Sequence, residues 1–129
     1  MIKQTFDIEN YWEVVVYYNL DCNFFDDIAL ELMKTGFKKA AIEEVYDTMK
    51  AKDAKAVTCS KIEEHRSVVI FNPHISKADY ISSIVHEAEH IKQAMLAAYH
   101  IEDRGEAPAY TIGYLVSRMY EVFKEFLCS

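Results

Sequence analysis

The chain has 129 residues, 51% of them hydrophobic, which is enough for one domain with a substantial core but too few for two, so we expect a single domain over residues 1–129. Only three residues are Gly and two are Pro, and no low-complexity stretch interrupts the hydrophobic pattern, which excludes a largely disordered or repetitive protein. The formal net charge of −7 at pH 7 argues against a nucleic-acid partner, because phosphate binding requires clustered Lys and Arg.

The N-terminal half begins with strand-forming residues and continues with helices. Residues 11–18 are rich in aromatic and β-branched side chains, which predicts a strand covered on both faces, and residues 2–8 are a candidate partner strand. Apolar residues recur at helical spacing over 23–35, and Gly36 is placed to end this helix. A second helix is predicted over about 38–52, with its charged residues on a solvated face.

A β-hairpin is predicted in the middle of the chain. Two short β segments, 56–60 and 67–71, lie on either side of a polar turn at 61–66. His65 lies in this turn, and we expect it to be a surface residue rather than a metal ligand. Pro73 ends the second strand, because Pro lacks a backbone N–H and disfavours helix in the residue before it.

The C-terminal half is predicted to form two long helices. The first covers about 76–100, and Ser76 is suited to cap its N-terminus. Its apolar residues recur at steps of three and four and define one apolar face: Ile81, Ile84, Ala88, Ile91, Met95 and Ala98. A charged turn at 102–106 follows, and Pro108 suits the first turn of a final helix that runs to about Leu127.

The most informative motif, His86-Glu87-Ala88-Glu89-His90, lies on the first of these two helices. Its pattern, HExxH, is that of zinc-dependent hydrolases. At a spacing of i, i+4 the side chains of His86 and His90 leave the same face of a helix, so both can bind one Zn²⁺ ion at about 2.0–2.1 Å. Glu87 points about 100° round the helix axis from His86, so it can accept a proton from a zinc-activated water without binding the metal. The pentad therefore predicts a zinc site with Glu87 as general base.

The same pentad also fits an ordinary amphipathic helix whose solvent face carries two His and two Glu, and the five residues alone do not separate the two interpretations. The helical periodicity places His86 and His90 nearly opposite the centre of the apolar face. The small residues Ser83, Ala94 and Ala97 lie beside them and would let a second element approach closely. This favours a shallow cleft over an open surface.

Three segments together resemble a known family of enzymes. The strand 67–71, the motif segment 85–90 and the segment Glu106-Ala107-Pro108-Ala109-Tyr110 are similar to small zincin-like metallopeptidases of the gluzincin type, especially the compact forms encoded by phages and prophages. The likeness covers roughly the C-terminal half of the chain. It implies an α+β fold, a zincin-like minimal domain in which a small antiparallel or mixed sheet packs on about four helices and a long helix carries the HExxH motif.

A third zinc ligand is needed, because catalytic zinc sites usually have three protein ligands and keep the fourth position for water. In related small zincins this ligand is a Glu in an E-x-x-A pattern, near the start of the helix after the HExxH helix. The resemblance assigns this position to Glu106. It also implies that an edge strand aligns the substrate by backbone pairing, for which residues 67–71 are the candidate.

Other residues could take the place of Glu106, because a straight motif helix puts the following turn about 15 Å beyond His90. On an antiparallel return, the final helix brings Glu121 level with the first histidine of the motif. Asp103 and His74 are further options. The identity of the third ligand therefore stays open among these four residues.

The expected function is that of a zinc-dependent metallopeptidase acting on a peptide or protein, with the two motif histidines and Glu106 as zinc ligands and Glu87 as general base. Tyr110 or Tyr114, on the same helical face as Glu106, is a candidate hydrogen-bond donor to the tetrahedral oxyanion. The alternative is a non-catalytic zincin-fold module that binds another protein and carries a structural metal or none. A further alternative is a helical interaction protein in which the pentad is accidental.

The cysteines and the N-terminus favour a cytoplasmic protein. Cys22, Cys59 and Cys128 are odd in number, far apart and without CxxC spacing, so neither a disulfide framework nor a cysteine zinc site is expected. The N-terminus lacks a basic region followed by an apolar run, and the most apolar stretch, 11–20, carries Glu13 and is too short to span a bilayer. We therefore expect reduced thiols and no membrane association.

Overall fold

The computed structural model describes residues 2–18, 25–51, 55–73 and 76–127. Its elements are, in chain order, β1 (Ile2–Ile8), β2 (Trp12–Tyr18), α1 (Phe25–Thr35), α2 (Lys39–Lys50), β3 (Ala56–Lys61), the short 3₁₀ turn η2 (Ile62–Glu64), β4 (Arg66–Phe71), α3 (Lys77–Tyr99) and α4 (Glu106–Leu127). The predicted α+β class is confirmed. The predicted helices also covered residues 23, 24 and 52, which lie outside the described residues.

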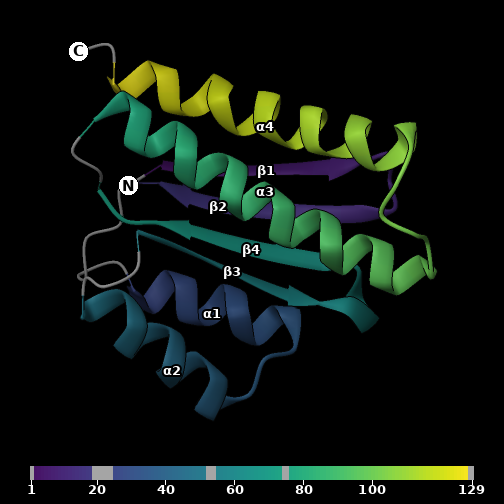
Figure 1. The fold of residues 1–129 in the computed structure, drawn as a ribbon. Coiled ribbons are helices and arrows are strands. Elements are labelled where there is room, and N and C mark those ends of the chain that lie inside the picture. The colour runs from purple at the N-terminus through teal and green to yellow at the C-terminus, as the bar shows by residue number, and fades with distance from the viewer. Residues whose placement is uncertain (1, 19–24, 52–54, 74–75, 128–129) are drawn as a thin grey trace.

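The four strands form one mixed sheet in the order β1-β2-β4-β3 (Figure 1). β1 pairs antiparallel with β2, and β3 pairs antiparallel with β4. The two hairpins are joined by the parallel pairing of β2 with β4 in the middle of the sheet. Both predicted strand pairs are therefore confirmed, and the sheet is mixed because the two pairs meet in parallel.

The sheet is covered on both faces, so the molecule has three layers. α3 and α4 lie side by side across one face, and α1 and α2 pack against the other (Figure 1). The side chains of β2 and β4 alternate between the two layers, which is why both strands are apolar at nearly every position. Val14, Val16, Tyr18, Val69 and Phe71 belong to the core under α3 and α4, and Val15, Tyr17, Val68 and Ile70 to the core over α1 and α2.

The prediction that residues 67–71 form the edge strand is wrong. β4, which contains these residues, is paired on both sides, and β3 is the edge strand next to it. The physical reason is the continuous apolar run from Val68 to Phe71, which is buried on both faces as a central strand requires. The residues of β3 are all partly exposed, as is typical of an edge strand.

Helix α3, which carries the motif, begins and ends close to where the sequence predicts. The hydroxyl of Ser76 accepts a hydrogen bond from the backbone N–H of Asp79 at 3.1 Å and so caps the first turn. The helix continues to Tyr99, and His100 then adopts a left-handed conformation with φ of 55°, which turns the chain toward α4. Gly36, with φ of 108°, ends α1 as predicted.

The structure also bears on the cysteines and on the membrane. Cys59 is a free thiol, and Cys22 and Cys128 lie outside the described residues. Burial and, second, the nearby charge of Glu87 raise the pKa of the Cys59 thiol to about 11, so it stays protonated at neutral pH. In the part of the chain that the structure covers, no helix is both long enough and apolar enough to cross a bilayer.

Candidate functional site

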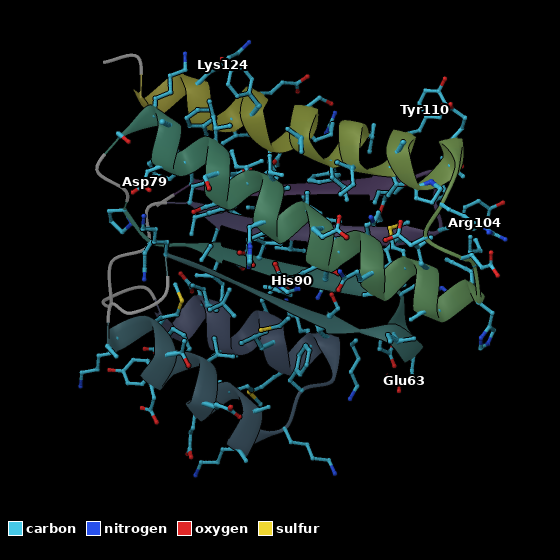
Figure 2. The ribbon with its side chains drawn as sticks, in the orientation of Figure 1. Glu63, Asp79, His90, Arg104, Tyr110 and Lys124 are labelled. Atoms are coloured by element: carbon cyan, nitrogen blue, oxygen red, sulfur yellow. The ribbon has the colours of Figure 1, made fainter. Side chains whose placement is uncertain are left out.

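The two motif histidines lie near the middle of α3, where the helix holds them one turn apart. Both are exposed, as their predicted position opposite the apolar face requires. Their Nε2 atoms lie 3.2 Å apart, and their rings meet edge to face with centroids 4.8 Å apart. The two imidazoles therefore converge on one point above the helix surface, on the side where His90 is labelled in Figure 2.

The separation of these two nitrogens suits a shared zinc ion. Two ligands bound at about 2.0–2.1 Å with a tetrahedral angle between them are about 3.3–3.4 Å apart. The observed separation is slightly shorter and also fits an N–H···N hydrogen bond between the two rings. A metal that replaced the shared proton would therefore find both nitrogens close to their required positions.

Glu87 lies between α3 and the sheet rather than on the open surface. It is 4% exposed, and Thr58 on β3 donates a hydrogen bond from Oγ1 to Glu87 Oε1 at 2.8 Å. A hydrogen bond to a carboxylate in a buried setting holds that oxygen firmly. The motif therefore combines an exposed pair of imidazoles with a buried acid that is anchored to the edge strand.

The exposed side chains of the two histidines lie on the side of α3 that is nearer to β3. Glu87, about 100° round the helix from His86, contacts that strand, while Ala88 and Ile91 are buried against the sheet. α4 packs along the other flank of α3 and lies over β1 (Figure 1). The body of α3 therefore separates the side chains of α4 from the histidine pair.

Glu106 is not brought to the histidine pair. From His90, α3 runs nine residues further to Tyr99, which is about 13–14 Å at 1.5 Å per residue. Glu106 begins α4 beyond the connecting loop, where it is exposed. Within the described residues, no group of three or more His, Cys, Asp or Glu side chains is arranged to hold a metal ion. In this described part of the chain, the two motif histidines therefore have no third potential metal ligand beside them.

Two of the alternative third ligands, Asp103 and Glu121, are not placed at the pair either. Asp103 forms an ion pair with Lys92 Nζ at 2.9 Å, and Lys92 also contacts Glu89 at 2.9 Å. Hydrogen bonds with Asp103 first and Glu89 second raise the pKa of Lys92, so this cation holds both carboxylates at neutral pH. Glu121 is an exposed residue of α4, and His74 lies outside the described residues.

Tyr110 and Tyr114 also lie away from the histidines. The hydroxyl of Tyr114 donates a hydrogen bond to the backbone carbonyl of Asp7 in β1 at 3.0 Å. Tyr110 points outward from the beginning of α4, on a different side of the molecule from His90 (Figure 2). The face of α4 that holds both tyrosines therefore meets β1 and solvent, and the structure brings neither hydroxyl to a substrate bound at the pair.

Thr58 contacts the motif although the HExxH pattern does not identify it. Residues of β3 alternate between the two layers, with Val57 and Cys59 over α2 and Thr58 under α3. The available sequence signal was a hydroxyl in the middle of a strand that precedes the motif helix. That signal becomes specific only once β3 is known to be the strand beside Glu87.

The chain matches no family model, no curated protein and no solved structure. Any functional assignment therefore depends on the geometry of the site itself. The parts of that geometry with chemical meaning are the convergent nitrogens of His86 and His90, the buried carboxylate of Glu87 and the open edge of β3.

Proposed function

We propose that the protein is a zinc-dependent metallopeptidase of the small zincin type, with His86 and His90 as metal ligands and Glu87 as general base. The observation that carries the proposal is the 3.2 Å separation of the two Nε2 atoms, which suits two ligands of one tetrahedral ion. The exposure of both rings adds support, because a catalytic zinc needs an open position for water and substrate. The family resemblance of residues 85–90 agrees with this assignment.

The residues of the chain have separate roles in this proposal. Zinc, when bound, supplies a Lewis acid that lowers the pKa of a water molecule toward about 7. Glu87 accepts the proton of the attacking water and later passes it to the leaving amine. Because Thr58 donates to Oε1, the second carboxylate oxygen is the one left for this proton. Thr58 is thus a positioning residue for the base.

The open edge of β3 is the part of the site that would align a substrate. An edge strand presents unpaired backbone N–H and C=O groups, with which an extended peptide can pair. Thr58 belongs to this strand and also contacts Glu87, so a peptide paired with β3 runs beside the motif. An extended peptide is therefore the substrate class that this arrangement favours.

The zinc content of the purified protein tests the metal site. Wild-type protein prepared without added metal is expected to hold about one zinc per chain, and His86→Ala and His90→Ala are each expected to hold little, because one imidazole cannot replace two. The matched control is His100→Asn, which removes an exposed imidazole from the end of the same helix and tolerates its left-handed backbone. Equal zinc content in all four proteins would contradict the assignment of the ligands.

Removing the Thr58 hydroxyl tests the positioning role. Thr58→Val is expected to lower the rate of hydrolysis of a mixed library of quenched fluorescent peptides about tenfold, because a hydrogen bond to a charged group contributes about 1.5 kcal/mol. Thr58→Ser, which keeps the hydroxyl, is expected to retain most of the rate. Zinc content should be unchanged in both variants, and a loss of zinc in Thr58→Val would show that Thr58 supports the metal site instead.

A non-catalytic module with the same architecture is the second candidate function. It is favoured by the two-ligand site, since the residues that the structure covers show no third donor, and by the burial of Glu87. This candidate predicts a protein without zinc that cleaves no peptide in the library. It also predicts that replacing both histidines by Ala leaves the unfolding temperature unchanged.

A further inference from the structure

A hollow lies near the C-terminal end of α3, away from the histidine pair. It has a volume of about 850 Å³, toward the upper end of the range typical of ligand pockets. Its walls come from the β1–β2 turn, the last turns of α3 and the first turns of α4. Four tyrosines line it, and we call it the tyrosine pocket after them: Tyr11, Tyr99, Tyr110 and Tyr114.

Three of these rings are held in place by contacts within the protein. The hydroxyl of Tyr99 donates a hydrogen bond to the backbone carbonyl of Tyr11 at 3.1 Å, and the two rings meet edge to face with centroids 6.4 Å apart. Tyr114 is fixed by its hydrogen bond to Asp7 and by an edge contact with Phe6 at 6.2 Å. The pocket is thus preformed, which lowers the entropic cost of binding.

The fourth ring is unlike the others. Tyr110 is 74% exposed and makes no hydrogen bond or ring contact with any residue that the structure describes. Ile101, which lines the same pocket, is also exposed. A phenol so placed offers an apolar ring and an unused hydroxyl donor to a ligand.

The charge around the tyrosine pocket is negative. Glu9 lines it, and neither Lys nor Arg is among its described lining residues. Glu106 is exposed next to the lining residue Ala107, and the nearby Arg104 is paired with Glu102 at 2.7 Å. A ligand that complements this surface is therefore cationic, and cations are also favoured over tyrosine faces.

We propose that the tyrosine pocket binds an extended, proline-rich peptide segment that carries Arg or Lys. Proline-rich segments in the polyproline II conformation dock in aromatic-lined grooves, because their rings pack on aromatic faces and their shape costs little entropy to fix. The carbonyls of such a segment have no internal partner, and the Tyr110 hydroxyl can donate to one of them. Glu9 supplies the counter-charge for a basic side chain. This inference is independent of the zinc site.

Fluorescence anisotropy with the full chain tests the proposal. The probe is a fluorescein-labelled peptide of repeated Pro-Pro-Arg triplets, which is expected to bind saturably. Tyr110→Ala is expected to weaken binding about tenfold or more, as truncation of an aromatic anchor does. Glu9→Gln is expected to weaken binding and to reduce its dependence on salt, because it removes the facing charge. Met33→Ala, which truncates an exposed apolar residue of α1, should change nothing.

Peptide controls separate the proposed ligand from other occupants. A Pro-Pro-Glu peptide should not bind, and a Gly-Gly-Arg peptide should bind about tenfold more weakly. Equal binding of the Gly-Gly-Arg peptide, or displacement of the probe by tetramethylammonium, would overturn the proline-rich assignment. Failure of the Pro-Pro-Arg peptide to bind would overturn it as well. So would a dimer of wild-type chains in sedimentation that Tyr110→Ala abolishes, because the occupant would then be a second copy.

Discussion

Replacing Glu87 with Gln is expected to lower the rate of peptide hydrolysis by about 10²–10⁴-fold, the usual contribution of a general base. Gln keeps the size of the side chain and can still accept the hydrogen bond that Thr58 donates. It cannot take a proton from water at neutral pH. Zinc content is expected to be unchanged, because Glu87 is buried toward β3 while the imidazoles of His86 and His90 point outward.

The matched control for this variant is Glu89→Gln, which alters the other carboxylate of the pentad. Glu89 contacts Lys92 at 2.9 Å and is only partly buried, so its loss is expected to leave the rate within a few-fold of wild type. Hydrolysis of the peptide library and zinc content are measured on both variants. A loss of zinc from Glu87→Gln, or an equal loss of rate in the two variants, would contradict the role of Glu87 as base.

Replacing Glu31 with Met is expected to destabilise the fold by about 2 kcal/mol, because it removes a buried carboxylate that accepts charge-assisted hydrogen bonds from the half-exposed Lys3 and the mostly buried Arg66. Glu31 is 6% exposed and contacts Lys3 at 3.0 Å and Arg66 at 3.2 Å. These contacts connect α1 with β1 and β4 across one face of the sheet. The measurement is urea unfolding at neutral pH. The control is Glu43→Met on α2, where the carboxylate is exposed and its contact with Lys39 is 3.8 Å.

The same carboxylate makes the stability depend on pH. Burial of Glu31 acts to raise its pKa, but hydrogen bonds from Lys3 and Arg66 outweigh burial and hold the pKa below the ordinary value of 4.5. A carboxyl whose pKa is lowered in the folded state stabilises the fold at pH values above its ordinary pKa. This stabilisation is lost as the pH falls through the folded-state pKa. Wild type should therefore lose more stability below pH 4.5 than Glu31→Met does. If the free energy of unfolding depended on pH in the same way in both proteins, Glu31 would make no contribution to the pH dependence.

The elements of the fold could be predicted from local pattern, whereas the order of the strands could not. The hairpins and helices follow from alternation, helical periodicity, the Ser76 cap and Gly36, all of which act over a few residues. Which strand of the second hairpin lies at the edge depends on the pairing of β2 with β4, a contact between distant segments. The unbroken apolar run Val68–Phe71 indicates a central strand. The family resemblance predicted an edge strand at these residues instead.

The residues of the candidate site also fall into a group that could be predicted from local pattern and a group that could not. His86, Glu87 and His90 could be placed from the sequence, because their geometry depends only on one uninterrupted helix. The positions of Glu106 and Tyr110 depend on which flank of α3 receives α4, and helical periodicity carries no information about that choice. α4 packs on the flank opposite the histidines, over β1. For the same reason, Thr58 could be recognised only once β3 was seen beside the motif.

The parallel pairing of β2 with β4 also limits how fast the chain can fold. Glu13 and Arg66, which are paired in register, are 53 residues apart in sequence. Closing so long a loop costs chain entropy before any contact in the middle of the sheet compensates for it. Each of the two hairpins, by contrast, needs only local chain closure. We therefore expect the parallel pairing of the two hairpins to limit the folding rate, and refolding to be slower than that of a helical bundle of equal length.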